Sequence, residues 1–379
     1  MSTAPIARWA NYFLRSGADF ESFWGEFLCE GRRRLLFILG RGFDPRMCDA
    51  IEVLLRAKGE SACECVLLEY DEGPTSPSQE HQPLVADNLK KLNRLLTEAG
   101  CAMLPSRTIR MESDDGRRIG SVSAARVFQS VDELCPYTDC VLDISAMPRA
   151  IYLPLLHELM YLVDNPGPAK APNLHVVVSE NPRLDAEIRD QAIDENAEYL
   201  HSFSAVDMEA TAQMPTIWIP LLGEGQSAQL QKIRDLVKPH EVCPLLPFPA
   251  LNPRRADNLI REYQTFLFDE MRLDPSNFLY AHERNPFQAY RQVQDTVERY
   301  ERSLQVLDGC KAVVSALSSK LLSIGAFLAV YELRLRRRLV GIAHVEARGY
   351  GMSGGGDKTR KHEPGELFEL WLAGECYAP

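Results

Sequence analysis

The sequence predicts an α/β protein of two tandem Rossmann-like units, with mostly parallel sheets and a helical N-terminal cap. Three observations support this fold class. Short continuous apolar runs alternate with segments of helical periodicity, as in a parallel sheet covered by helices on both faces. The chain has 379 residues, enough for about two domains. An apolar run followed by Gly-x-Gly also occurs twice, at Gly40 and at Gly223.

The N-terminal half holds the cap and the first domain. Apolar and aromatic residues recur at helical spacing in residues 1–30, which predicts two short helices that form the cap. Residues 31–205 form the first Rossmann-like domain. Its strands are expected at residues 35–39, 65–68, 108–111, 140–144 and 174–179, and its helices at 47–55, 84–96, 121–134 and 150–163.

Residues 206–379 form the second Rossmann-like domain, because the segment 203–215 lacks a clear period and a new strand, Gly-x-Gly and helix follow it. Further strands are expected near residues 242–246, 278–281, 311–316 and 339–345. A Gly-rich polar loop at residues 348–361 is either a mobile segment or a lid. A closing amphipathic segment contains Leu367 and Trp371.

The two halves share a second feature. About a hundred residues after each Gly-x-Gly, a strand leads through a small polar turn to a basic residue that begins a helix. The two stretches are DISAMPRAIYLPLL, which contains Ser145 and Arg149, and VSALSSKLLSIGAFLAV, which contains Ser318, Ser319 and Lys320. The matching order indicates a structural duplication.

All four turns are expected at the carboxyl ends of strands, where open α/β sheets bind ligands. Glycine lets backbone N–H groups approach an anion, and the next helix presents its positive N-terminus. The candidate binding residues are therefore Gly40, Arg41, Gly42, Asp44, Arg46, Ser145, Arg149, Gly223, Gly225, Gln226, Ser318, Ser319 and Lys320. Simple tight turns and internal ion pairs are the alternative explanation of the same residues.

Composition and charge restrict the functional classes. Apolar residues at 45% and charged residues at 25% are typical of a globular protein. The net charge of -11 argues against a general nucleic-acid-binding surface. The ten cysteines include no C-x-x-C pair, the N-terminus lacks an apolar signal region, and no apolar run is long enough to span a membrane. We therefore expect a cytoplasmic protein with reduced thiols and no membrane contact.

Two short motifs resemble known families. SALSSKLLSIGA resembles the turn and small-residue helix of CRISPR-associated Rossmann-fold (CARF) sensor domains, and SAMPRAIYLPL resembles them more distantly. This resemblance makes the second domain CARF-like, with Ser318, Ser319 and Lys320 at a nucleotide or cyclic oligonucleotide ligand. It implies signalling in a bacterial antiviral defence system. The protein would then bind a partner protein of a defence complex, and it could form a homodimer.

The loop Gly42-Phe43-Asp44-Pro45 resembles the first loop of nucleotidyltransferases of the HUP class. The histidines that follow this loop in that family are replaced by RMCDA. Because those histidines stabilise the transferring phosphoryl group, that chemistry is not expected here. A strand-to-helix turn with Pro45 at the helix start is the alternative explanation.

Asp44, Asp71 and Asp143 are the candidate catalytic residues, because each lies at or just after a strand end. If neighbouring strands bring them together, they could support a metal-assisted reaction at a phosphate group, with a nucleotide and Mg²⁺ as the cofactor. No His or Cys cluster with metal-ligand spacing occurs, so no resident metal is expected. Nucleotide or phosphate-ligand binding and signalling is the first prediction. A metal-assisted nucleotide or phosphoester-processing enzyme and a non-catalytic scaffold that binds a partner protein are the alternatives.

Overall fold

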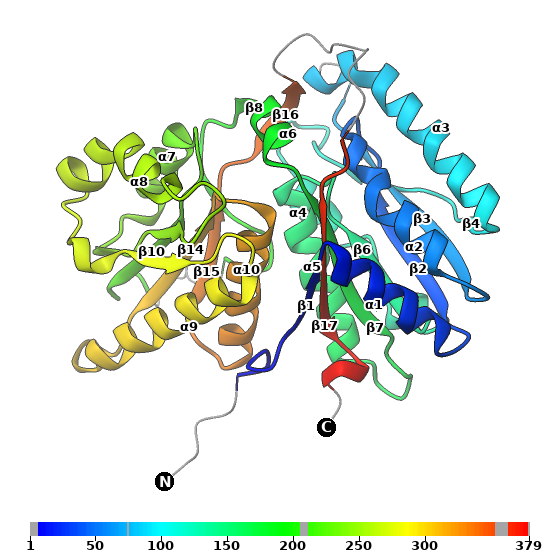
Figure 1. The fold of residues 1–379 in the computed structure, drawn as a ribbon. Coiled ribbons are helices and arrows are strands. Elements are labelled where there is room, and N and C mark those ends of the chain that lie inside the picture. Colours follow the sequence, from blue (N-terminus) through cyan, green and yellow to red (C-terminus); the bar gives the residue numbers. More distant parts are fainter. Residues whose placement is uncertain (1–6, 74–75, 205–210, 353–362, 378–379) are drawn as a thin grey trace. The chain divides into compact units, whose positions relative to one another are not determined.

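The computed structural model describes residues 7–73, 76–204, 211–352 and 363–377. The chain divides into two compact units (Figure 1). The first unit comprises Tyr12–Ala192 and Ala347–Pro379, and the second comprises Met1–Asn11 and Ile193–Glu346. Each unit contains its own sheet, and both sheets are mostly parallel. The predicted α/β fold class is confirmed.

The first unit is built on an eight-stranded sheet. Its strands are β1 (Phe13–Ser16), β2 (Arg34–Gly40), β3 (Ala62–Asp71), β4 (Ala102–Met103), β5 (Arg107–Arg110), β6 (Asp139–Asp143), β7 (Asn173–Glu180) and β17 (Glu366–Ala373). Their order is β1-β17-β7-β6-β2-β3-β4, and β5 pairs with β3. The strands from β7 to β4 are parallel, whereas β17 runs antiparallel to both of its neighbours.

Helices cover both faces of this sheet. They are α1 (Ala18–Cys29), α2 (Asp49–Ala57), α3 (Gln82–Ala99), α4 (Gly120–Ala124), α5 (Arg149–Asp164) and α6 (Pro182–Glu187). Figure 1 shows α1 and α2 in front of the sheet and α5 behind it. Short 3-10 turns lie at Pro45–Cys48, Pro77–His81, Val131–Glu133 and Glu375–Tyr377, and β8 (Ile188–Ile193) pairs with β16 (Ala347–Met352).

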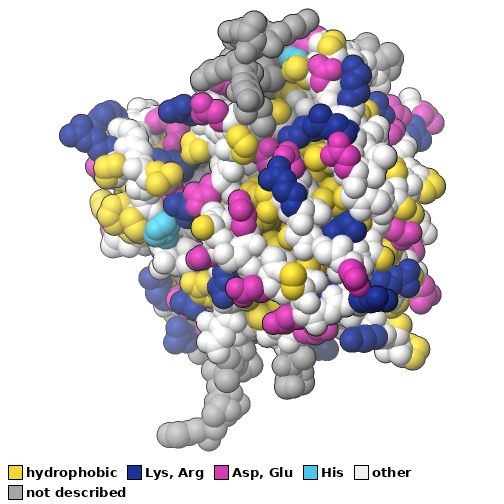
Figure 2. All heavy atoms as spheres, turned by 45° about the vertical axis from the view of Figure 1, so that its right-hand side comes forward, with side chains coloured by type: hydrophobic (Ala, Val, Ile, Leu, Met, Phe, Trp, Pro, Cys, Tyr) yellow, Lys and Arg dark blue, Asp and Glu magenta, His cyan; other side chains and the backbone are white. Residues whose placement is uncertain are grey.

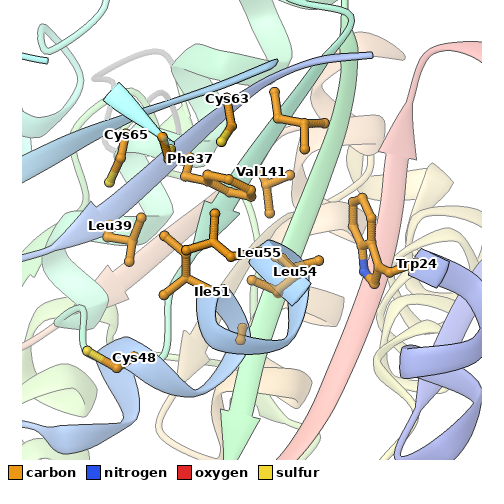
Figure 3. Packing of buried hydrophobic residues seen from close by; sticks show 14 of the residues in the cluster. Trp24, Phe37, Leu39, Cys48, Ile51, Leu54, Leu55, Cys63, Cys65 and Val141 are labelled. Carbon is orange, nitrogen blue, oxygen red and sulfur yellow. The ribbon is translucent and has the colours of Figure 1, made fainter. Parts of the chain in front are cut away.

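The core on the α1 and α2 side follows from the period of two in the strands. Phe37 and Leu39 of β2 face Ile51 and Leu54 of α2, with Trp24 of α1 beside them (Figure 3). The intervening residues of β2 point to the opposite face and are equally buried. After the exposed Arg34, the strand is therefore one continuous apolar run, because none of its residues from Leu35 onward faces water.

The second unit repeats this plan around a seven-stranded sheet. Its strands are β9 (Glu198–Tyr199), β10 (Thr216–Leu221), β11 (Glu241–Val242), β12 (Leu245–Pro247), β13 (Leu279–Ala281), β14 (Lys311–Ala316) and β15 (Val340–His344). Their order is β13-β12-β10-β14-β15-β9, with β11 beside β10. Its helices are α7 (Ser227–Val237), α8 (Arg255–Glu262), α9 (Pro286–Ser303) and α10 (Lys320–Leu335), with a π-helix at Thr265–Glu270 and 3-10 turns at Pro275–Asn277 and Gln305–Leu307.

The two sheets share one topology. In each, the first parallel strand, β2 or β10, lies centrally, with β3 or β12 on one side and β6 or β14 on the other. The helices that follow β6 and β14, α5 and α10, each have 16 residues and begin at Arg149 and Lys320 respectively. This agreement is consistent with the tandem Rossmann-like units expected from the sequence.

Residues 1–30 do not form a separate cap of two helices. Phe13–Ser16 is the strand β1, which pairs with β17, and α1 is the one helix among the described residues of this segment. Gly17 has a positive φ of 56° between the two elements and ends the strand. The expected helix at 121–134 is also shorter, because α4 ends at Ala124 and Ser130 caps a new 3-10 turn.

The expected domain 206–379 needs a correction at its end. Ala347–Met352 pairs with β8 of the first unit, and β17 lies between β7 and β1 in the first sheet. Pairing between strands so distant in sequence leaves no local signal. Residues 348–352 of the expected Gly-rich loop belong to β16, and residues 353–361 lie outside the described residues. No described helix is both long enough and apolar enough to cross a membrane.

Candidate functional site

Each sheet has a switch point where the strand order reverses, between β2 and β6 in the first unit and between β10 and β14 in the second. The turns after these strands hold the predicted binding residues, and they meet in pairs. The turn 40–44 faces the turn 143–149, and the turn 223–226 faces the turn 317–320. The structure therefore brings the candidate residues together within each unit.

The first pair of turns is tight at Gly40 and less tight at Gly42. A Cβ on Gly40 would lie 2.2 Å from Tyr70 Oη and 2.9 Å from Met147 Cγ. A Cβ on Gly42 would lie 3.6 Å from the Ala146 carbonyl oxygen, which is an ordinary contact. Gly40 is thus required by close packing, whereas a Cβ at Gly42 would fit in ordinary contact.

Backbone donors are available on both sides of this switch point. Within the described part of the chain, the N–H groups of Gly42, Phe43 and Ala146 donate no hydrogen bond. The carbonyl oxygens of Gly42 and Asp44 accept bonds of 3.0 and 3.2 Å from Asn88 Nδ2 of α3, which holds the loop in place. No side chain caps the N-terminus of α5. These N–H groups and the helix dipole form an electropositive edge.

Arg46 and Asp44 form an internal ion pair. The guanidinium group of Arg46 is only 3% exposed, and it donates to the Asp44 carboxylate at 2.7 to 3.1 Å and to Asp185 Oδ1 at 2.7 Å. Burial lowers the pKa of Arg46, but the two carboxylates outweigh it and raise that pKa. Asp44 also caps the following 3-10 turn by accepting from Arg46 N. The geometry favours the ion-pair alternative for both residues.

Arg41 and Arg149 are the remaining cations at this switch point. Arg41 Nη1 lies 2.9 Å from Glu69 Oε1, and about a third of each side chain is exposed (35% and 34%). Arg149 is half-buried at the first residue of α5. Ser145, by contrast, is fully buried, and its Oγ accepts a 2.8 Å bond from Ser179 N, which ties the turn to β7.

The three candidate catalytic carboxylates have separate roles. Asp44 faces Arg46, Asp143 Oδ1 accepts a 2.8 Å bond from Ser145 N, and the exposed Asp71 accepts a 3.3 Å bond from Gly73 N. The described residues contain no group of three or more His, Cys, Asp or Glu side chains that could hold a metal ion. Metal-assisted catalysis by these three residues therefore finds no support.

The second pair of turns is closed by the protein itself. A Cβ on Gly223 would lie 2.2 Å from the Leu317 carbonyl oxygen, so this glycine lets two backbones touch. Gly225, with a φ of 72°, donates its N–H to Glu262 Oε1 at 2.7 Å, and Gln226 N donates to Tyr263 Oη at 2.9 Å. The Glu262 carboxylate occupies the position at the turn where a bound anion would lie.

The start of α10 is also occupied. Ser319 Oγ accepts a 3.3 Å bond from Leu322 N and caps the helix. Ser318 is buried in the same turn, and Lys320 is half-buried at the first helical residue. Nearby, Arg255 makes a bidentate ion pair with Glu224 at 2.8 and 2.9 Å, which lowers the pKa of Glu224 against the effect of burial. Acidic groups therefore surround the second switch point.

Several residues that contact these turns could not be predicted from the sequence. Tyr70 and Asn88 in the first unit, and Glu262 and Tyr263 in the second, lie on other elements than the turns they contact. An Asn on the buried side of an apolar helix is the one local signal that could have marked Asn88. On the face shown in Figure 2, Lys and Arg side chains are interspersed with Asp and Glu, so no broad basic patch lies there.

Comparisons with known proteins leave the family open. No protein-family model and no curated protein matches the chain. Among solved structures, it is similar to a universal stress protein from Archaeoglobus fulgidus DSM 4304, with 8% sequence identity and a TM-score of 0.24. The match covers 81% of this chain and 94% of that chain. A likeness of this size carries no functional conclusion.

Proposed function

We propose that this protein binds a nucleotide or another phosphate-bearing ligand at the switch point of its first unit. The observation that supports this is the contrast between the two units. In the first unit, the N–H groups of Gly42, Phe43 and Ala146 have no acceptor among the described residues, and no side chain caps α5. In the second unit, Glu262, Tyr263 and Ser319 already accept from the equivalent turns.

Phosphate oxygens are suitable acceptors for this arrangement. Successive N–H groups and a helix N-terminus stabilise an anion without any base or acid catalyst. Arg41 can add a cation, because a partly exposed ion pair such as Arg41–Glu69 is worth only about 0–1 kcal/mol and can open. Arg46 cannot turn outward in the same way, since the buried Asp44 carboxylate would lose its counter-ion inside the protein.

We propose binding rather than metal-assisted catalysis at this switch point. The carboxylates that a metal-assisted reaction would use serve other contacts, since Asp44 pairs with Arg46 and Asp143 Oδ1 accepts from Ser145 N. The defence context, the partner protein and the homodimer implied by the CARF resemblance stay predictions, as does a scaffold role. The resemblance also places the ligand on Lys320 of the second unit, which makes Lys320 a matched control for Arg149.

The test is a thermal-shift screen of mononucleotides, dinucleotides and cyclic oligonucleotides, followed by calorimetry on any compound that stabilises the protein. A ligand at about 100 times its Kd should stabilise the folded state by about 2.7 kcal/mol. Arg149→Ala should remove a charged hydrogen bond worth about 1.5–3 kcal/mol and weaken binding roughly tenfold to a hundredfold. Lys320→Ala should bind as the wild type does.

Two results would overturn the proposal. If no compound shifts the unfolding midpoint, ligand binding of this class is wrong and the scaffold alternative gains. If Lys320→Ala loses binding while Arg149→Ala keeps it, the ligand lies in the second unit, as the CARF resemblance implies.

A further inference from the structure

Two buried cysteines face each other across neighbouring strands of the first sheet. The parallel register pairs Glu64 with Ala102 and Cys65 with Met103, which places Cys63 of β3 beside Cys101, the residue before β4. Cys63 and Cys101 belong to one apolar cluster, so both side chains point to the same face. Figure 3 shows Cys63 on this face above Phe37 and Val141.

The spacing suits a disulfide. Neighbouring strands lie about 4.8 Å apart, within the range of about 4.4–6.8 Å that Cα atoms of bonded cysteines span. Both residues are free thiols in this structure. Cys101 directly follows Gly100, whose φ of 64° ends α3, so the chain turns into β4 at this position.

The two thiols are chemically unequal. The adjacent Cys101 thiol lowers the pKa of Cys63, burial opposes this, and the Lys58 ammonium group lowers it further. Lys58 is held near by its 3.2 Å bond to the Ser61 carbonyl oxygen. The neighbouring Cys63 and burial raise the pKa of Cys101. Because the Lys58 ammonium group favours the thiolate of Cys63, we take Cys63 as the attacking sulfur and Cys101 as its partner.

The pair lies next to the edge of the sheet and keeps a small exposed fraction. Cys63 and Cys101 are 6% and 8% exposed, and β4 is the edge strand of the sheet. Cys65, two residues further along β3, is completely buried, and burial raises its pKa. The same strand therefore offers a reactive cysteine and an unreactive one.

We propose that Cys63 and Cys101 form a peroxide-sensitive thiol pair that oxidises to a disulfide between β3 and β4. The Cys63 thiolate attacks one oxygen of the peroxide, the O–O bond breaks, and Cys63 becomes a sulfenic acid while the other oxygen leaves as water or alcohol. The Cys101 sulfur then attacks the Cys63 sulfur, gives up its proton and displaces the hydroxyl group as water. Two electrons pass from the thiols to the peroxide.

The disulfide would affect the position of the candidate binding loop through α3. The helix ends at Ala99, two residues before Cys101, and its Asn88 holds the carbonyl oxygens of Gly42 and Asp44. A disulfide would fix the end of α3 to β3, while Asn88 lies on the same helix closer to its start. The inference on the thiol pair does not depend on ligand binding at that loop.

The experiment treats the reduced full-length chain with hydrogen peroxide and maps its peptides under non-reducing conditions. We expect a cross-linked peptide that contains Cys63 and Cys101, with the mass of two hydrogens lost. The unfolding midpoint of the oxidised protein should be higher than that of the reduced protein. Cys63→Ser and Cys101→Ser should each remove the cross-link, and Cys101→Ser should leave a sulfenic acid at Cys63 that dimedone traps.

Cys65→Ser is the matched control, because it removes a thiol from the same strand and face without touching the pair. It should keep the Cys63–Cys101 cross-link. If the wild type forms other cross-links but not this one, or if Cys65→Ser abolishes it, the proposal is wrong. The wild-type peptide map decides the question even if a serine variant fails to fold.

Discussion

Raising the pH should destabilise the first unit through His175, a histidine buried between two carboxylates. His175 of β7 lies with Nδ1 2.7 Å from Glu369 Oε1 of β17 and with Nε2 3.4 Å from Asp139 Oδ1 of β6. All three side chains are fully buried. Burial lowers the pKa of His175, but the Glu369 and Asp139 carboxylates outweigh it and raise that pKa to about 9.

The size of the stability change follows from the difference between the pKa of His175 in the folded and in the unfolded state. An unfolded histidine titrates at 6.5 and the folded one at about 9. At roughly 1.4 kcal/mol per pH unit, protonated His175 contributes about 3 kcal/mol to the free energy of unfolding. Because the folded pKa is the higher one, this contribution is complete below pH 6.5 and is lost as the pH rises through about 9.

Urea unfolding between these two pH values measures the loss. Tryptophan fluorescence reports on this unit, because the rings of Trp24 and Trp371 lie 5.0 and 4.8 Å from the His175 ring. Glu369→Gln keeps the shape but removes one carboxylate, so the pKa of His175 should fall and the pH dependence should shrink. Glu366→Gln, on the same strand, is the control.

Burial raises the pKa of Glu369 and the facing His175 imidazolium opposes this rise, so loss of the His175 proton also disfavours the charged form of Glu369. If Glu369→Gln and the wild type lose equal stability over this range, His175 is not the group that titrates. If the stability of the wild type rises with pH, the pKa of His175 is not raised in the folded state.

Three substitutions test the packing of the turns, each by urea unfolding. Gly40→Ala places a Cβ 2.2 Å from Tyr70 Oη and should cost about 1–3 kcal/mol, with part of the loss restored by adding Tyr70→Phe; no rescue would contradict the contact. Arg46→Ala should cost about 3–5 kcal/mol, because two carboxylates lose their counter-ion; a neutral effect would show that the pair is not buried. Gly223→Ala should be more damaging than Gly40→Ala, since the Leu317 backbone it meets at 2.2 Å cannot rotate away; equal costs would refute this.

The order of elements could be predicted because it depends on local periodicity. Most of the central strands are continuous apolar runs in the sequence, namely β2, β6, β7, β10 and β14. In the helices between them, apolar residues recur at helical spacing. The positions of the turns follow from the same pattern, since parallel strands all end at one edge of the sheet. Predicting which residues converge therefore required no long-range information.

Which donors in those turns are free could not be predicted. Glu262 accepts from Gly225 across 37 residues, and Asp185 accepts from Arg46 across 139. Neither contact has a spacing that a single sequence reveals. The Asp44–Arg46 pair is different, because the two residues are two positions apart and the ion-pair alternative was visible from the start. The CARF-like motif predicted the ligand in the second unit, where Glu262, Tyr263 and Ser319 already accept the hydrogen bonds at the equivalent positions.

The strand β17 has a consequence for biosynthesis. It lies between β7 and β1 and supplies Glu369 to the buried histidine, yet the ribosome makes it after the whole of Ile193–Glu346. Until then, the emerging first unit has an open edge at β7 and a buried imidazole without its second carboxylate. The second unit, which is nearly continuous in sequence, can complete its sheet earlier. During translation, the half that is made first is therefore expected to finish folding last.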